Sequence, residues 1–277
     1  MESSGRVADQ ILQRPSLYVH SLSSNCAVSS KCIVCLYKLI PKTVMSKLTG
    51  FSIPPNKRPE TCPRFNSVDK TQFSSTCGLY HHSDRLLTVG DGDFSFSLSL
   101  VKGGHDPTRL TATSYEPYKT LISVYDNFQS ILQQLNEFHV PVYHGVDATQ
   151  LACSHQISKQ AYDIVIWNFP CLGAAEGADG QANEIEANQN LLRTFFANVT
   201  EYLDPQGRQE VHITHKTIEP FSWWDIVSIG VKSGWDHCGS FLFDRCLYPG
   251  YINRKALDKK SFPCVDALVC TLHDIAV

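Results

Sequence analysis

The residues with the most distinctive chemistry form an acidic, glycine-marked turn at residues 90–95 (GDGDFS), directly after a short apolar run. A strand that ends in such a turn and opens a helix presents backbone N–H groups to a cofactor. A dinucleotide-binding turn reads G-x-G-x-x-G, but Ser95 occupies the third glycine position. Asp91 and Asp93 would repel a pyrophosphate and suit a cofactor with a cationic amino-acid end. S-adenosylmethionine (SAM), which has a sulfonium and an ammonium group, is such a cofactor.

Further polar side chains follow the next three strand candidates in chain order. Glu116 lies about 20 to 25 residues past the turn, where a carboxylate accepts hydrogen bonds from ribose hydroxyls. Asp147 is placed to accept the exocyclic amine of adenine, and Ala148 leaves space for the ring. Asn168 is placed to hold a planar amide-like group such as a nucleobase edge. The structural alternatives are helix caps for Glu116 and Asp147 and a local turn for Asn168.

These four motifs follow one another in the order that a SAM site requires, and chance agreement of all four is improbable. We therefore assign cofactor binding to Gly90, Asp91, Gly92, Phe94, Ser95, Glu116, Asp147 and Ala148. We assign catalysis to Asn168 and Asp93. The sequence suggests no metal ligands within this set.

The elements that must position these residues are strands alternating with helices from Leu86 onward, which predicts a mostly parallel sheet with right-handed crossovers. The predicted strands are Leu86–Gly90, Leu110–Ser114, Val140–His144, Ile164–Asn168 and Glu210–Thr214. The predicted helices are Ser97–Lys102, Tyr118–Phe138, Leu151–Gln160, Ile185–Tyr202 and Trp223–Ser233. An antiparallel hairpin, predicted to close the sheet edge, comprises Ser240–Cys246 and Val265–His273. The fold class is α/β and Rossmann-like, with helices on both faces and ligands at the carboxyl ends of the strands.

The composition of the 277-residue chain is that of an ordinary globular protein, with 43% hydrophobic and 18% charged residues. A net charge of −3 excludes a global basic field for nucleic acid, so any RNA contact must come from a local patch. We expect no membrane segment and no signal peptide. The 11 cysteines are odd in number and irregularly spaced, which favours reduced thiols in an intracellular protein.

Residues 1–83 differ from the rest of the chain and are predicted to be a poorly ordered N-terminal extension, followed by the Rossmann-like domain at residues 84–277. A Pro-rich cluster at residues 54–59 interrupts this part. Cys32-x-x-Cys35 is the best zinc candidate, but a second close cysteine pair is absent from the sequence. We therefore expect no zinc site.

Six segments together resemble one family, the Rossmann-like (class I) methyltransferase domain of the 25S rRNA uridine-N3 methyltransferase type. The segments are residues 90–97 (GDGDFSFS), 112–114 (ATS), 145–149 (GVDAT), 168–170 (NFP), 188–192 (NQNLL) and 248–254 (YPGYINR). The resemblance covers about residues 86 to 273. Asp91 stands where the family usually has Glu, and His215 where it usually has an apolar residue. The same domain occurs fused to a ferredoxin-fold anticodon-binding domain in some animal proteins, and here we expect the stand-alone form.

The resemblance implies methyl transfer from SAM to N3 of a uridine. That atom loses a proton before it attacks the methyl group, so the enzyme must position the base and remove the proton. Candidates for the general base are Asp93, His212 and Lys216, while Asn168 is expected to orient the uracil. Because N3 lies on the pairing edge, the uridine must be unpaired or flipped out.

A late segment combines tyrosines, basic residues and a Pro-Gly turn, a pattern typical of loops that bind phosphate and stack bases. We expect Tyr248, Tyr251, Arg254 and Lys255 to contact RNA. The alternative is a solvated hairpin between the last two strands. The pair Trp223-Trp224 is expected on a helix that faces the core.

The leading hypothesis is therefore a SAM-dependent methyltransferase for N3 of a uridine, in large-subunit ribosomal RNA. One alternative is a catalytically silent RNA-binding module that retains the fold, and another is a methyltransferase with a different substrate. A ribosomal RNA substrate implies a nucleolar or nuclear location, and the alternative is cytoplasmic. The sequence does not reveal an oligomeric state.

Overall fold

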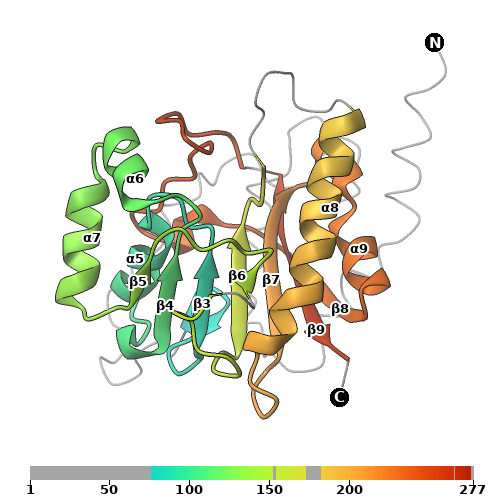
Figure 1. The fold of residues 1–277 in the computed structure, drawn as a ribbon, viewed down its shortest axis with the longest axis horizontal. Helices are drawn as coiled ribbons and strands as arrows, with labels where there is room; N and C mark the ends of the chain where they lie inside the picture. Colours follow the sequence, from blue (N-terminus) through green and yellow to red (C-terminus); the bar gives the residue numbers. More distant parts are fainter. Residues whose placement is uncertain (1–75, 152–153, 173–181, 265, 276–277) are drawn as a thin grey trace, which may run out of the picture. The chain divides into compact units, whose positions relative to one another are not determined.

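The computed structural model describes residues 76–151, 154–172, 182–264 and 266–275. Its main feature is a seven-stranded mixed sheet with the order β5-β4-β3-β6-β7-β9-β8 (Figure 1). The strands are β3 (Leu86–Val89), β4 (Leu110–Thr113), β5 (Val142–Tyr143), β6 (Ile164–Asn168), β7 (Glu210–Lys216), β8 (Trp235–Leu242) and β9 (Ala267–Asp274). The chain leaves β3 toward β4 and β5 on one side and returns to β6 and β7 on the other. This switch point is where open α/β sheets bind ligands.

The first five of these strands pair in parallel, and the last two add an antiparallel edge. The predicted hairpin exists as the antiparallel pair β8–β9, but β9 lies between β7 and β8 and pairs with both. Adjacent residues of β3 enter different halves of the core: Leu87 and Val89 pack on one face and Leu86 on the other. The centre of the sheet is therefore buried on both faces, in keeping with the predicted helices on both faces.

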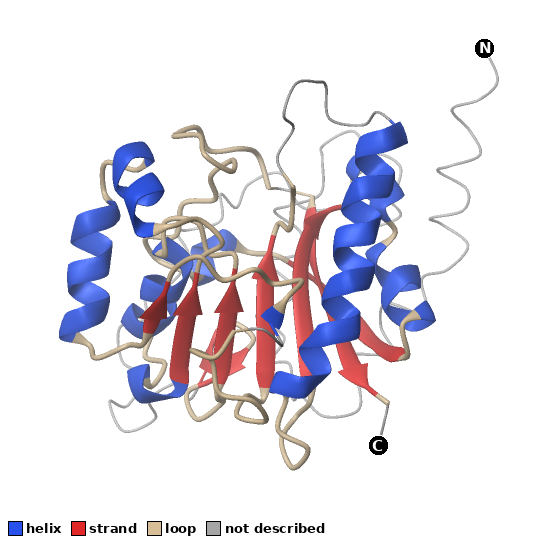
Figure 2. Cartoon of the chain, viewed as in Figure 1, coloured by secondary structure: helices blue, strands red, loops and turns tan. Residues whose placement is uncertain are grey.

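Helices cover both faces of this sheet (Figure 2). One layer packs α8 (Ala182–Val199) and α9 (Ile226–Lys232), and the other packs α5 (Ser95–Lys102) and α7 (Phe128–Glu137). The remaining helices are α6 (Tyr118–Val124) and the short 3-10 segments η1 (Pro107–Arg109), η3 (Thr200–Tyr202), η4 (Phe221–Trp224) and η5 (Arg245–Leu247). The α/β, Rossmann-like prediction is confirmed. No helix in the described ranges is long and apolar enough to span a bilayer.

Three predicted helices differ from the structure. The pattern over Tyr118–Phe138 is two helices, because Tyr125 adopts an extended backbone between α6 and α7 and buries its ring. The predicted helix at Trp223–Ser233 is interrupted at Asp225, whose φ is 48°. The helix predicted at Leu151–Gln160 is absent from the part that the structure describes, where turns follow residue 154.

A small hairpin precedes the sheet, with β1 (Thr76–Cys77) paired to β2 (Tyr80–His81). Tyr80 is 1% exposed and packs against Phe96 and Tyr248. The hairpin lies on the N-terminal side of the boundary predicted between residues 83 and 84, yet it belongs to the core. That boundary stays a prediction. Cys32 and Cys35 lie outside the described residues, and within the described ones no group of three metal-ligating side chains occurs.

Candidate functional site

The acidic turn connects the end of β3 to α5 and lies beside the end of β4, at the edge where the parallel strands finish (Figure 1). Gly90 has a φ of 62°, and a Cβ there would lie 2.7 Å from Nε1 of Trp167 on β6. The backbone N–H of Asp91 donates to the carbonyl of Thr113 at 3.0 Å. The turn is thus fixed to both neighbouring strands, and glycine is required because a side chain would collide with the indole.

The Asp91 carboxylate faces the start of α5. Its Oδ2 accepts hydrogen bonds from the backbone N–H of Ser97 at 2.8 Å and from the Ser97 hydroxyl at 2.6 Å. Burial raises the pKa of this carboxyl to about 7, although the bonds from Ser97 oppose the rise. The neighbouring Asp93 raises the pKa further. Asp91 therefore holds the turn on the start of α5, and the backbone of Phe96 also stabilises its carboxylate.

The raised pKa makes the stability of the free protein depend on pH. The folded-state pKa of Asp91, about 7, lies above the ordinary 3.8, so the folded protein binds more protons between these values. The contribution of Asp91 to the free energy of unfolding therefore falls as pH rises from about 4 to about 7. Asp91→Asn should remove this component. Urea titrations of both forms near pH 5 and pH 8 measure it, and an identical pH dependence of the two forms would contradict it.

Asp93, predicted as a catalytic residue, is a structural anchor instead. Its side chain is buried, its Oδ1 accepts from the backbone N–H of Ser95 at 3.0 Å, and its Oδ2 pairs with Nε of Arg254 at 2.9 Å. With both oxygens engaged, the carboxylate does not fit the role of general base. Arg254, predicted to bind RNA, is correspondingly held inside the protein and also donates to the carbonyl of Lys259.

Phe94 and Ser95 contribute packing rather than side-chain contacts to a cofactor. The Phe94 ring is fully buried and lies against Phe128 and His144. The Ser95 hydroxyl accepts from the backbone N–H of Ile252 at 3.2 Å. Both side chains therefore anchor the turn to the protein interior. Gly92 lies near the Tyr125 hydroxyl, with 3.5 Å between that oxygen and the place of a Cβ.

The end of β4 lies next to the turn, and the segment after β5 lies next to the end of β4. Glu116 is half-buried, and its carbonyl accepts from the Ser114 hydroxyl and from the Gly145 N–H. Asp147 Oδ1 accepts from the backbone N–H and the hydroxyl of Thr149, at 2.8 and 2.7 Å. The alternative considered for Asp147 was a cap of the helix predicted at Leu151–Gln160, and no α-helix occurs in the described residues of that range. Ala148 is buried.

The fourth strand end offers a polar amide. The Thr214 hydroxyl donates to Oδ1 of Asn168 at 2.5 Å, across the paired ends of β6 and β7. Since the carbonyl oxygen is engaged, the amide NH₂ of Asn168 is the group that can donate to a ligand. Phe169 follows with a φ of 54°, and its N–H donates to the Thr214 carbonyl. The sequence did not single out Thr214, because its role depends on the register of two strands.

The two other candidates for the general base, His212 and Lys216, lie at different places along β7. His212 lies in the middle of β7, is 1% exposed and bonds to Glu210 at 2.8 Å, so it cannot reach the strand ends. Lys216 is the last residue of β7, and its ammonium lies over the rings of Phe221 and Phe262 at 4.2 and 4.6 Å. Lys216 thus places a positive charge at the edge where Asn168 ends β6.

The tyrosines of the predicted RNA loop are packed inside the protein. Tyr248 is 3% exposed and stacks on Phe243, and Tyr251 lies edge-on against Phe96. Burial raises the pKa of both hydroxyls. Stacking on RNA bases is therefore excluded for Tyr248 in this structure. The exposed residue of the predicted set is Lys255.

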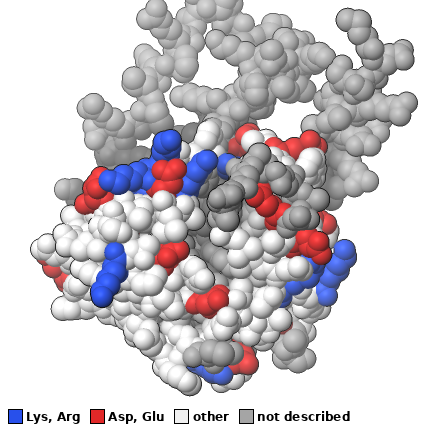
Figure 3. All heavy atoms as spheres, turned by 45° about the horizontal axis from the view of Figure 1, so that its top comes forward, with Lys and Arg blue, Asp and Glu red and all other residues white. Residues whose placement is uncertain are grey.

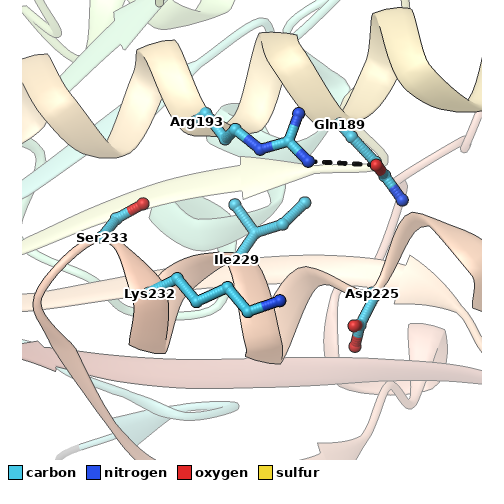
Figure 4. Close-up of a pocket in the computed structure, with 6 residues that line it drawn as sticks. All are labelled: Gln189, Arg193, Asp225, Ile229, Lys232 and Ser233. Carbon is cyan, nitrogen blue, oxygen red and sulfur yellow. Dashed lines mark hydrogen bonds between the residues drawn. The ribbon is translucent and has the colours of Figure 1, made fainter.

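Basic side chains gather on the face that carries the strand ends, next to acidic ones (Figure 3). Lys255, Lys259 and Lys260 are exposed on the loop before β9, and Lys259 pairs with Asp126 at 2.7 Å. A separate hollow of about 250 Å³ lies between α8 and α9 (Figure 4). No sequence pattern indicated that hollow.

The strand order, with an antiparallel edge on a parallel sheet and an acidic glycine turn at the switch point, defines a Rossmann-like methyltransferase. A family model described as "BMT5-like: rRNA (uridine-N3-)-methyltransferase BTM5-like" matches residues 87–255. The chain therefore belongs to the BMT5-like family of rRNA methyltransferases. This confirms the resemblance and the prediction of an rRNA methyltransferase.

Several relatives accompany this match. An uncharacterized Arabidopsis thaliana protein is 33% identical over 64% of this chain and 84% of its own length. The Saccharomyces cerevisiae 25S rRNA (uridine(2634)-N(3))-methyltransferase is 22% identical over 64% of this chain and 67% of its own. The human ferredoxin-fold anticodon-binding domain-containing protein 1 is 33% identical over 47% of this chain, which spans 19% of that protein. Among solved structures, a fibrillarin/Nop5p complex aligns with a TM-score of 0.41 and 15% identity, covering 71% of this chain and 75% of that one.

Proposed function

We propose that this chain uses SAM to methylate N3 of an unpaired uridine in large-subunit ribosomal RNA. The observation that supports this most directly is the arrangement at the switch point. There the acidic turn of residues 90–95 and the Asn168 amide end two neighbouring strands, β3 and β6. The family match supplies the reaction class. RNA is the proposed partner, and a nuclear or nucleolar location follows from the substrate.

The residues of this edge fit SAM in their chemistry. The turn carries a carboxylate, Asp91, whose pKa of about 7 lets it ionise beside a cation. Glu116 places a second, half-buried carboxylate at the end of β4, as ribose hydroxyls require. The small side chain of Ala148 is buried in the segment after β5. When bound, SAM supplies an electrophilic methyl group on its sulfonium.

The protein's own contribution is to hold the uracil and to stabilise the charge that develops on it. When N3 releases its proton to solvent water, negative charge spreads over the two flanking carbonyl oxygens. The Asn168 NH₂ is placed to donate to one of them, and the Lys216 ammonium at the adjacent strand end favours the same charge. Asp93 takes no part in proton removal, because its carboxylate is paired with Arg254.

RNA would approach this edge over the exposed lysines of the loop before β9. Lys255 and Lys260 are exposed, and this local charge offsets the net charge of −3 of the whole chain. Phosphate contacts of this kind position an RNA without reading its sequence. The pairing edge of the target base must be free, which restricts the substrate to unpaired or flipped uridines.

Asn168→Asp is the sharpest test, because it keeps the oxygen that accepts from Thr214 and removes the amide donors. We expect about a 100-fold fall in methyl transfer to a ribosomal RNA fragment, with SAM affinity unchanged within about two-fold. Mass spectrometry of the digested RNA measures N3-methyluridine, and calorimetry measures SAM binding. Asn136→Asp, on the exposed side of α7, is the matched control.

Two results would overturn the proposal. RNA binding without any methyl transfer by the wild-type protein would favour a silent module that retains the fold. SAM binding without RNA binding would favour a methyltransferase with a different substrate.

A further inference from the structure

Two loops present large apolar side chains to solvent just beyond the ends of β6 and β7. Leu172 follows β6 and is 56% exposed, while Ile218 and Trp223 follow β7 and are 49% and 48% exposed. Exposed apolar groups that cluster next to a ligand site mark a surface that binds something. They lie a few residues from Asn168 and Lys216, so whatever covers them also borders the proposed methylation site.

One turn of α8 fixes both loops. The Asn188 side chain accepts from the backbone N–H of Leu172 at 3.0 Å and donates to the carbonyl of Glu184 at 2.8 Å. The next residue, Gln189, donates from Nε2 to the carbonyl of Trp223 at 2.8 Å. Adjacent residues of one helix therefore hold the backbones of two loops. The exposed side chains are presented from an ordered support rather than from free chain.

Trp223 differs from every other tryptophan of the protein. Trp167, Trp224 and Trp235 are 7%, 5% and 2% exposed, respectively. Trp224 points inward and stacks on His215 with a centroid distance of 4.4 Å, so the η4 turn directs its neighbour outward. The expectation that both tryptophans face the core is therefore correct for Trp224 and wrong for Trp223. An indole that stays half-exposed on a fixed backbone offers a flat surface for stacking.

Positive charge lies along the same support. The Gln189 Oε1 accepts from Nη2 of Arg193 at 3.1 Å. The Gln189 side chain therefore links the Trp223 backbone carbonyl to the Arg193 guanidinium. Arg193 and Lys232 face each other across the hollow between α8 and α9, which Asp225 and Ser233 also line (Figure 4). An aromatic face flanked by cations is the combination that single-stranded nucleic acid recognises.

We propose that Trp223 is a stacking platform for an unpaired nucleobase that flanks the target uridine, with the adjoining backbone directed toward Arg193. This inference rests on the proposed function and names the form in which the RNA is bound. The occupant is a base rather than an apolar peptide for two reasons. The surface continues the methylation site, and the adjoining hollow is lined by two cations, Arg193 and Lys232, against one carboxylate, Asp225. Trp223 acts on substrate binding and touches no reacting atom.

The test uses intrinsic fluorescence, because Trp223 is the exposed indole and the other three are buried. Titration with an oligouridylate of about ten nucleotides should quench the emission of the 277-residue chain. Trp223→Phe should lose most of the quenching and keep its affinity within about three-fold, since a phenyl ring still stacks. Trp223→Ala should bind about ten-fold more weakly. KM for RNA should rise by a similar factor while kcat changes little.

Phe138→Ala is the matched control, because Phe138 is 41% exposed at the far end of α7. It should leave RNA affinity unchanged. An equal affinity of Trp223→Ala and wild type for the oligouridylate, with SAM binding intact, would overturn the stacking platform and leave the proposed function standing. Absence of oligouridylate binding by a wild-type protein that binds SAM would overturn both.

Discussion

Arg254→Ala lowers the free energy of unfolding by about 3 kcal/mol or more, because it leaves the buried Asp93 carboxylate without its partner. The change also removes donors to the Lys259 carbonyl and to Asn127, which hold the loop before β9 against the start of α7. Urea unfolding at neutral pH measures the effect. The loss should exceed that of any single surface lysine by a wide margin.

Lys255→Ala is the control for this prediction. Lys255 is the exposed neighbour of Arg254, so its removal should change stability by less than about 0.5 kcal/mol while weakening RNA binding. In the double variant Asp93→Asn with Arg254→Ala, the buried charge is gone, and stability should recover in part. If instead Arg254→Ala folds as stably as wild type and loses RNA affinity like Lys255→Ala, the arginine belongs to the RNA surface.

Gly90→Ala should destabilise the protein by about 2 to 4 kcal/mol and weaken SAM binding at least ten-fold. A φ of 62° is unfavourable for alanine, and the added methyl group would lie 2.7 Å from Nε1 of Trp167. The Trp167 indole cannot move away easily, because it packs against the Phe195 ring with a centroid distance of 4.8 Å. Any shift of the turn also strains the bond from Asp91 to Thr113.

Gly104→Ala separates the effect of backbone strain from the effect of the collision with Trp167. Gly104 also has a positive φ, 98°, but nothing lies within 4 Å of its Cβ position. The Gly104→Ala protein should therefore lose stability through backbone strain alone and bind SAM normally. Calorimetry with SAM and chemical denaturation of both variants give the comparison. A Gly90→Ala protein as stable as Gly104→Ala, with normal SAM affinity, would show that the turn adapts.

The parallel part of the fold could be predicted because its strands are short apolar runs with polar ends. The observed β6 matches the predicted Ile164–Asn168 at both ends. The edge strand was harder to predict from the sequence: it was predicted at Ser240–Cys246 and lies at Trp235–Leu242. Most residues of β8 are exposed, so burial imposes little pattern on their types. The break between α6 and α7 at Tyr125 could not be predicted, because the helical periodicity of the sequence continues through it.

The location of the candidate site could also be predicted, but the partners of its side chains could not. That the acidic turn and Asn168 meet at one edge follows from parallel strands alone. The pairing of Asp93 with Arg254 joins residues far apart in the chain, and no local pattern distinguishes such an arginine from one that binds phosphate. The same holds for Tyr248, whose burial depends on Phe243 and on the N-terminal hairpin.

That hairpin has a consequence for the order in which the protein folds. Tyr80 and Gly78 contact Tyr248, so an early and a late segment of the described residues close over each other. Contacts of such long sequence separation carry a high entropic cost and form late. During synthesis, the hairpin must wait with its tyrosine exposed until residue 248 has left the ribosome. The apolar surface of α5 around Phe96 stays uncovered over the same interval. Nascent chains of this protein are therefore expected to depend on chaperones until the loop before β9 has been made.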